Sequence, residues 1–336
     1  MAVTAIIIAD AAEAGGKIQV IIPPHSPLTL AHFSKPCALP MTDPSRTSGI
    51  MLHPASLPGR FGVGEFGPEA HRWLECLSRM GQSVWHLNVP GSAFPVQIGS
   101  AGNPLLLSFD ALRNDGVLQP SDLAMLPAFN EERIDVAPVI EVRTAFLRLA
   151  ARRFLGQANA SPLLHHAFER FCEAAVQWLN DHALCAALKT AADLGEWAGS
   201  CDLATMDETT IARLREEFSH EIDEQKALQF LFFRQWHRLR ASAHDLGVRV
   251  LVDADDATHR IGDLVEGRDQ MITTDAAAGW TGIEEAWQSD ASIVLCPAQA
   301  MFENSPSAAS WRFTWEQFTP EKQLRLRTLT AKTGRL

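Results

Sequence analysis

The sequence contains no tyrosine, although it has nine tryptophans and seventeen phenylalanines. A sugar-binding cleft commonly uses tyrosine, because the phenol combines a flat apolar face with a hydroxyl group. The chain also lacks a CxxC or HExxH pattern, a GxxxxGK[ST] loop and a GxGxxG loop after a strand. These patterns bind metals or phosphates, so we expect neither a metal nor a cofactor.

Basic clusters and long apolar runs are missing as well. The formal net charge is -11, with 40 acidic and 29 basic residues, so we expect no nucleic-acid partner. No apolar stretch approaches the ~20 residues of a membrane span, and we expect no membrane partner. The opening MAVTAIIIADAAEAGG has no basic segment ahead of its apolar run, unlike a secretory signal. Six scattered cysteines are expected to be thiols. A cytoplasmic location is the resulting prediction.

The order of apolar and polar segments indicates one main domain. Residues 1–45 alternate apolar patches with proline and serine, which is typical of an N-terminal extension or linker. The main domain is predicted over residues 46–336. Its first part reads as strand, helix and strand, in SGIMLHPASLPG, GPEAHRWLECLSRMG and SVWHLNVPG.

The rest of the domain mixes helices with three further apolar runs. Helical periodicity dominates from about residue 110 to 245, which predicts a helical insert subdomain. The runs GVRVLVDAD, MITTD and ASIVLCPAQ then read as strands that end in polar residues. Such strands, separated by helices, favour a parallel α/β sheet or barrel whose site lies at the carboxyl ends of the strands.

Several of these segments closely resemble the 4-α-glucanotransferases (amylomaltases, glycoside hydrolase family 77). The likeness is carried by SGIMLHPASLPGRFGVGEFGPEAHRWL, GQSVWHLNVPG and AGNPLLLSFDAL, and it is nearly ungapped from Ser48 to Gly91. SIVLCPAQAMFENSPSAASWRF is similar to the family's eighth-strand region. The resemblance implies a (β/α)₈ barrel that moves α-1,4-linked glucan segments, so an α-1,4-glucan or maltooligosaccharide is the expected partner.

The acidic motifs of this family are hard to find in the chain. The resemblance implies a nucleophilic Asp and an acid/base Glu on the fourth and fifth strands, about 5 Å apart. Only residues 254–270 separate Asp253, at the end of the third strand, from Met271. One βα unit of a barrel takes about 30 residues, so three units do not fit there. The predicted fold is therefore an incomplete or shortened TIM-type barrel of the α/β class.

Three acids remain as catalytic candidates. Asp253 resembles a strand-end Asp of the family, although it also suits a cap for the following segment. Asp263 lies in HRIGDLVEG, which echoes the nucleophile motif if one residue is inserted and reads equally well as a short polar helix. Asp275, in TTDAAAGW, aligns with the neighbour of the family's sugar-binding acid, and a shift of one residue would make it that acid.

Three other residues are candidates for contacts with a substrate. His53 is placed to donate a hydrogen bond at the mouth of a barrel, or else to stabilise its own turn. Trp85 and Asn103 lie in segments that keep the family pattern, VWHLNVPG and AGNP. The alternative for Trp85 is a place in the hydrophobic core.

Three functions remain open at this point. In the first, the chain is a catalytically impaired, amylomaltase-like protein of α-1,4-glucan metabolism that at most binds glucan or has a regulatory role. In the second, it is an active 4-α-glucanotransferase that uses Asp253, Asp263 and Asp275. In the third, exposed sheet edges make it an interaction module or a homo-oligomer, unless residues 1–45 cover those edges.

Overall fold

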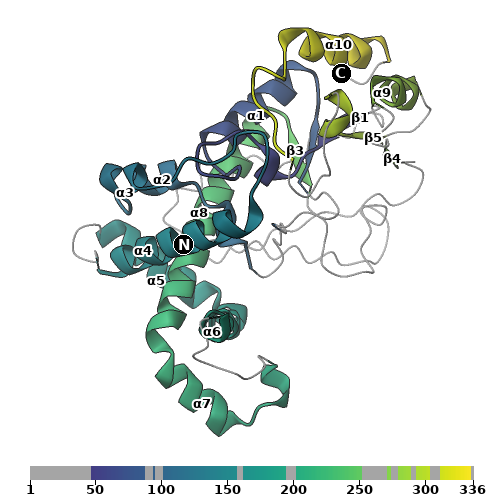
Figure 1. The fold of residues 1–336 in the computed structure, drawn as a ribbon. Coiled ribbons are helices and arrows are strands. Elements are labelled where there is room, and N and C mark those ends of the chain that lie inside the picture. Colours follow the sequence, from purple (N-terminus) through teal and green to yellow (C-terminus); the bar gives the residue numbers. More distant parts are fainter. Residues whose placement is uncertain are drawn as a thin grey trace, which may run out of the picture. The chain divides into compact units, whose positions relative to one another are not determined.

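The computed structural model describes residues 47–87, 94, 101–156, 162–193, 202–251, 271–273, 279–288, 293–302 and 311–333. The described residues form two compact units, which we treat separately. The sheet unit consists of the described parts of residues 42–150 and 231–336, and it holds all the described strands. The helical unit is the described part of residues 151–230 (Figure 1).

The sheet unit is built on five parallel strands in the order β3-β2-β1-β5-β4. Their bounds are β1 (Thr47–Met51), β2 (Val84–His86), β3 (Arg249–Leu251), β4 (Met271–Thr273) and β5 (Ile293–Pro297). All four pairings between neighbours are parallel. This sheet confirms the predicted α/β class. The incomplete barrel and the helical insert stay predictions.

The register aligns the carboxyl ends of the central strands. Met51 of β1 pairs with His86 of β2 and with Pro297 of β5. The approach of β1 to β2 requires Gly49, because a Cβ there would lie 2.4 Å from the Val84 Cβ. The carboxyl ends of β1, β2 and β5 therefore lie at the same edge of the sheet.

Helix α1 (Pro68–Arg79) connects β1 to β2, as the sequence predicts. Pro68 occupies the first helical position, where its missing N–H costs nothing. The positions expected to form the apolar face, among them Trp73, Leu74 and Leu77, have no exposed surface. This helix packs against β2.

Two further helices of the sheet unit are α9 (Gly279–Gln288) and α10 (Pro320–Lys332). Figure 1 shows them next to each other, and α9 also contacts β5. The buried Trp287 indole N–H donates to the Thr330 hydroxyl at 3.2 Å, which ties the two helices together. Thr330 also accepts from the Gln82 side chain at 2.9 Å, so the same hydroxyl reaches the segment before β2.

The remaining α-helices of the described residues lie between β2 and β3 along the chain, as helical periodicity predicted. They are α2 (Phe109–Asn114), α3 (Pro120–Ala124), α4 (Val136–Gly156), α5 (Pro162–Ala174), α6 (Val176–Asp193), α7 (Glu208–Glu217) and α8 (Ser219–Asp245), and the short η3 (Pro104–Leu106) and η4 (Leu203–Thr205) lie among them. The units divide this segment, because α4 and α8 each run from one unit into the other. In the helical unit, Leu184 and Leu188 of α6 pack with Leu214 of α7 in a buried apolar cluster.

Two expectations from composition can be compared with the structure. Cys76, Cys172 and Cys296 are thiols outside any disulfide, as expected. Cys185 is disulfide-bonded, so the expectation of a thiol is wrong there. Within the described ranges, no helix has both the length and the apolar character needed to cross a membrane.

Candidate functional site

His53 follows β1 and begins the short helix η2 (Pro54–Ser56). Its Nδ1 accepts a hydrogen bond from the Ala55 N–H at 3.0 Å, so the proton of the neutral ring belongs on Nε2. The side chain is buried, and burial lowers the pKa of His53 to about 4, against the opposing effect of a backbone hydrogen bond with Phe94. His53 is therefore neutral at pH 7 and stabilises its own turn.

Trp85 and Asn103 also have local partners. The Trp85 side chain is fully buried in β2, and its indole N–H donates to the Leu52 carbonyl at 2.8 Å. Trp85 is thus hydrogen-bonded to Leu52, which precedes His53 in the chain. Asn103 is half-buried, and its side-chain oxygen accepts from the Leu105 N–H at 3.0 Å, which caps η3. These contacts describe structural roles, and contacts of the three residues with a substrate stay a prediction.

The three predicted catalytic acids, Asp253, Asp263 and Asp275, lie outside the described residues. The polar groups described below all belong to the loop after β1 and to the segments that pack against it.

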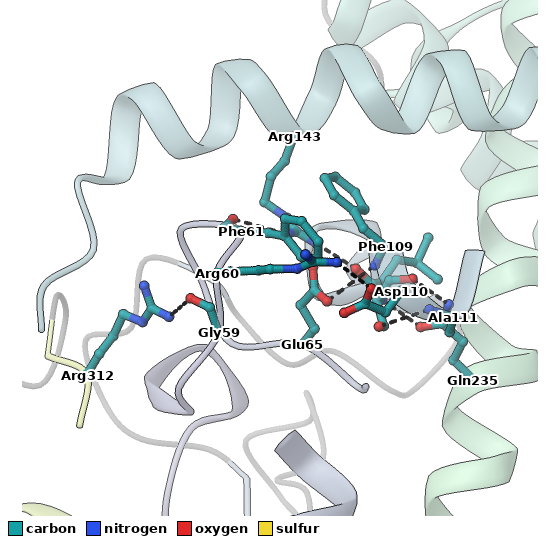
Figure 2. A network of polar contacts seen from close by, with 12 residues as sticks. Gly59, Arg60, Phe61, Glu65, Phe109, Asp110, Ala111, Arg143, Gln235 and Arg312 are labelled. Atoms are coloured by element: carbon teal, nitrogen blue, oxygen red, sulfur yellow. Dashed lines mark hydrogen bonds and ion pairs between the residues drawn. The ribbon is translucent and has the colours of Figure 1, made fainter. Parts of the chain in front are cut away.

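The loop after β1 is anchored by a buried carboxylate, Glu65 (Figure 2). Its Oε1 lies 2.7 Å from the Nη1 of Arg143 on α4. Its Oε2 accepts from the backbone N–H of Phe109, at the start of α2, at 3.2 Å. One carboxylate therefore fixes the loop to two helices. Burial raises the pKa of Glu65, and the charge and hydrogen bond of Arg143 oppose that rise.

Arg143 completes the anchor from the other side. Its guanidinium has no exposed surface and donates to the carbonyl of Leu107 at 2.5 Å. It also lies 4.2 Å from the centre of the Phe109 ring, within cation–π distance. A buried cation needs such a set of partners, because removing it from water is costly.

Gln235 of α8 secures the chain next to this ion pair. Its side-chain oxygen accepts from the Ser108 N–H at 2.7 Å, and its side-chain nitrogen donates to the Ser108 carbonyl at 3.2 Å. The Ser108 hydroxyl in turn accepts from the Ala111 N–H and caps α2. Both backbone groups of a buried residue are thereby satisfied by one amide.

Arg312 fixes the opposite end of the loop. It is buried, and it donates to the carbonyl of Gly59 and, at 2.9 Å, to the carbonyl of Asn130. Burial lowers the pKa of Arg312 to about 10, which leaves it charged at pH 7. The loop, the segment before α4 and the C-terminal part of the sheet unit are thus joined through one guanidinium.

A cavity of about 410 Å³ opens beside this loop, and we call it the loop pocket. Its volume is within the range of small-molecule sites, about 300–1,000 Å³. Its walls combine carboxylates, one arginine and aromatic rings. The carboxylates are those of Glu65, Glu69, Asp110, Glu131 and Glu316. The arginine is Arg60, and the aromatic rings are those of Phe61, Phe313 and Trp315.

Sequence reasoning missed this pocket. None of the candidate residues lies in GRFGVGEFG, the glycine-rich segment after the first strand, so Glu65 was not a candidate. Its partner Arg143 comes from a helix 78 positions further along the chain. Sequence periodicity reports on residues a few positions apart, so it gives no signal for a pairing between Glu65 and Arg143. The one available hint was an acid placed between the glycines and phenylalanine of a loop that follows a buried strand.

The fold and these polar groups define an α/β protein with a parallel sheet and an anchored loop at the strand ends. The sequence model of the 4-alpha-glucanotransferases, glycoside hydrolase family 77, matches residues 52–259, and the chain belongs to this family. This finding confirms the resemblance described above.

Individual relatives agree with the family match. The chain is 33% identical over 215 residues to a 4-alpha-glucanotransferase of Synechocystis sp., covering 62% of this chain and 42% of the relative. It is 34% identical over 215 residues to a 4-alpha-glucanotransferase of Thermus thermophilus, with the same coverage of 62% and 42%. The chain thus spans about two-fifths of the length of the curated relatives it matches.

A solved structure shares the fold. The amylomaltase from Streptococcus agalactiae, determined in complex with acarbose, superposes with a TM-score of 0.68. The comparison covers 86% of this chain and 99% of that chain at 15% sequence identity. At this identity the likeness concerns the fold alone.

Proposed function

We propose that this chain binds α-1,4-glucan segments and does not transfer them. The observation that carries the proposal is the short segment between Asp253 and Met271. It has no room for the barrel strands that would hold a nucleophile and an acid/base. A retaining transfer without these two carboxyl groups has neither a covalent intermediate nor a protonated leaving group.

Retained binding is supported by the family match over residues 52–259. The relatives that match are named 4-alpha-glucanotransferases, and the solved amylomaltase was determined with acarbose. The part of the family that this chain shares contains the first strands and their loops. A protein that keeps these loops without the acids would act as a glucan-binding or regulatory relative.

The second candidate is an active 4-alpha-glucanotransferase, and family membership favours it. It requires that two of Asp253, Asp263 and Asp275 lie about 5 Å apart in one cleft. A third candidate is association through the sheet, because β3 and β4 are the outer strands of the described sheet. A homo-oligomer in solution would support that candidate.

The test separates transfer from binding in one preparation of the full chain. The protein is incubated with maltotriose, and the products are separated by chromatography. An active family member from Thermus thermophilus serves as the positive control. We expect no glucose or longer maltooligosaccharides from this chain. Calorimetric titration with maltotriose is expected to show saturable binding.

Transfer products would contradict the proposal. In that case Asp253→Asn, Asp263→Asn and Asp275→Asn identify the acids that are used. Glu284→Gln is the matched control, since Glu284 is a half-exposed acid on α9, in an ion pair with Arg325. A titration without any binding would equally reject the glucan-binding role.

A further inference from the structure

We propose that the loop pocket binds a neutral sugar residue of an α-glucan through its hydroxyl groups. The inference rests on the proposed function of glucan binding and assigns it to a defined place. It uses the described cavity between the loop after β1 and residues 313–316. The three predicted catalytic acids are not needed for it.

The charges around the pocket favour a neutral ligand over a cation. Three of its carboxylates already have an arginine partner: Glu65 with Arg143 at 2.7 Å, Asp110 with Arg60 at 2.8 Å, and Glu69 with Arg72 at 3.9 Å. A cationic ligand would compete with these guanidinium groups. A hydroxyl group only needs a lone pair on an oxygen that is already held in place.

Such lone pairs remain on the carboxylates. An ionised carboxylate offers about four acceptor positions. On Glu65, Oε1 accepts from the Arg143 guanidinium, Oε2 accepts from the Phe109 N–H, and the Ser108 side chain contributes a further hydrogen bond. A sugar presents several O–H donors at once, which suits a wall of oriented acceptors. Arg60, whose side chain is 60% exposed, supplies donors for the oxygen atoms of the ligand.

Trp315 gives the pocket an apolar wall. Its ring is half-buried, with the fully buried Phe313 in edge contact at 5.4 Å between ring centres. The flat C–H face of a pyranose packs well against such a ring. The indole N–H donates to Glu69, and the guanidinium of Arg72 lies 3.9 Å from the ring centre. Both contacts hold the ring in one orientation before a ligand arrives, which lowers the entropy cost of binding.

A negatively charged sugar should be rejected. The pocket walls contain five carboxylates and one arginine. A phosphate group would meet like charges, and such juxtaposition is unfavourable at close range. The pocket therefore distinguishes a neutral glucan end from a sugar phosphate.

The experiment titrates the full chain with maltotriose by calorimetry and repeats the titration with Trp315→Leu and Glu69→Gln. Each variant is expected to weaken binding about tenfold, since about 1.4 kcal/mol corresponds to a factor of ten. Glucose 1-phosphate is expected to bind at least about tenfold more weakly than glucose. Spermidine is the cationic probe, and we expect no saturable binding.

The chain offers a matched control on α9 and α10. There Arg325 lies 4.4 Å from the Trp280 ring centre and pairs with Glu284 at 2.7 Å, as Arg72 does with Trp315 and Glu69. Trp280→Leu and Glu284→Gln should leave maltotriose binding unchanged. Circular dichroism verifies that each variant is folded. If Trp315→Leu does not fold, the maltotriose affinity of Glu69→Gln provides the test.

Each outcome is distinct. If the native chain binds maltotriose and the pocket variants bind as the controls do, this inference is overturned while the proposed function stands. If the native chain binds no glucan, the proposed function fails and this inference fails with it. Saturable spermidine binding that Glu69→Gln weakens would overturn the neutral-ligand assignment.

Discussion

Arg143 and Glu65 form an ion pair with 2.7 Å between Nη1 and Oε1, and the guanidinium is fully buried. The pair joins α4 to the loop after β1, so two segments far apart in the sequence depend on one contact. Its desolvation is costly, and hydrogen bonds from the guanidinium to the Leu107 carbonyl and from the Phe109 N–H to Glu65 offset part of that cost.

Removal of one partner should therefore be severe. Arg143→Met leaves Glu65 buried without its cation, and we expect the free energy of unfolding to fall by about 3–5 kcal/mol. Urea unfolding followed by near-ultraviolet circular dichroism measures the change. The double variant Glu65→Leu with Arg143→Met should regain much of the loss. Arg60→Met breaks an exposed pair with Asp110 and should cost under about 1 kcal/mol. Equal losses in the two single variants would contradict this account.

His53 should make stability depend on pH in the acidic range. Burial lowers the pKa of folded His53 to about 4, compared with 6.5 in an unfolded chain. As the pH falls below 6.5, the unfolded state takes up the proton first, so the folded state loses stability until about pH 4. The full effect is about 3 kcal/mol. Thermal unfolding between pH 7 and about pH 4 measures it.

His53→Asn tests the assignment, because an Asn oxygen can still accept from the Ala55 N–H. This variant should flatten the pH dependence without removing it, since burial also lowers the pKa of His237 to about 4. His166→Asn is the control, at a histidine whose side chain is 65% exposed. An unchanged pH profile in His53→Asn would show that the buried imidazole is not responsible.

Gly102 should not tolerate a side chain. A Cβ at this position would lie 2.0 Å from two atoms of the Phe232 ring, which is itself fully buried. Gly102→Ala is expected to lower the free energy of unfolding by about 1–3 kcal/mol, the typical cost of an overpacked core. At Gly156, the last residue of α4, an added Cβ meets no atom of the described residues within 4 Å, and Gly156→Ala should stabilise the protein by about 0.4–1 kcal/mol by reducing the freedom of the unfolded chain. We expect the melting temperature to fall in Gly102→Ala and to rise in Gly156→Ala. A Gly102→Ala protein as stable as the native chain would contradict this prediction.

Gln235 should be needed for the start of α2. Gln235→Leu removes the amide oxygen that accepts from the buried Ser108 N–H, at a cost of about 1–3 kcal/mol. The Ser108 carbonyl still accepts from the Leu112 N–H at 3.0 Å. Urea unfolding measures the loss. Gln177→Leu, at an exposed position of α6, is the control and should be nearly neutral. If the two variants unfold alike, the amide contributes little.

Much of the sheet unit was predictable from local pattern. The strand at residues 47–51, the helix with Trp73 and Leu77 on its apolar face, and the strand ending at His86 follow from hydrophobic spacing and from Pro and Gly punctuation. These signals act over a few residues, so they survive in a single sequence. The alternation of strands and helices also predicted the parallel arrangement.

The candidate site was much less predictable. His53, Trp85 and Asn103 were candidates for substrate contacts, and the structure describes each with a local partner. The loop pocket depends on Glu65 and Trp315, which are 250 positions apart and share no motif. Only folding brings such residues to one cavity.

The sequence by itself determined the α/β class, the strand and helix order of the sheet unit, and the family, because these depend on short-range periodicity and ordered motifs. The tertiary structure decided which charges meet. Arg143 reaches the Glu65 loop from helix α4, and Arg72 orients Trp315 from α1. Electrostatic partners are set by distance in space, and distance in space is what a linear sequence does not record.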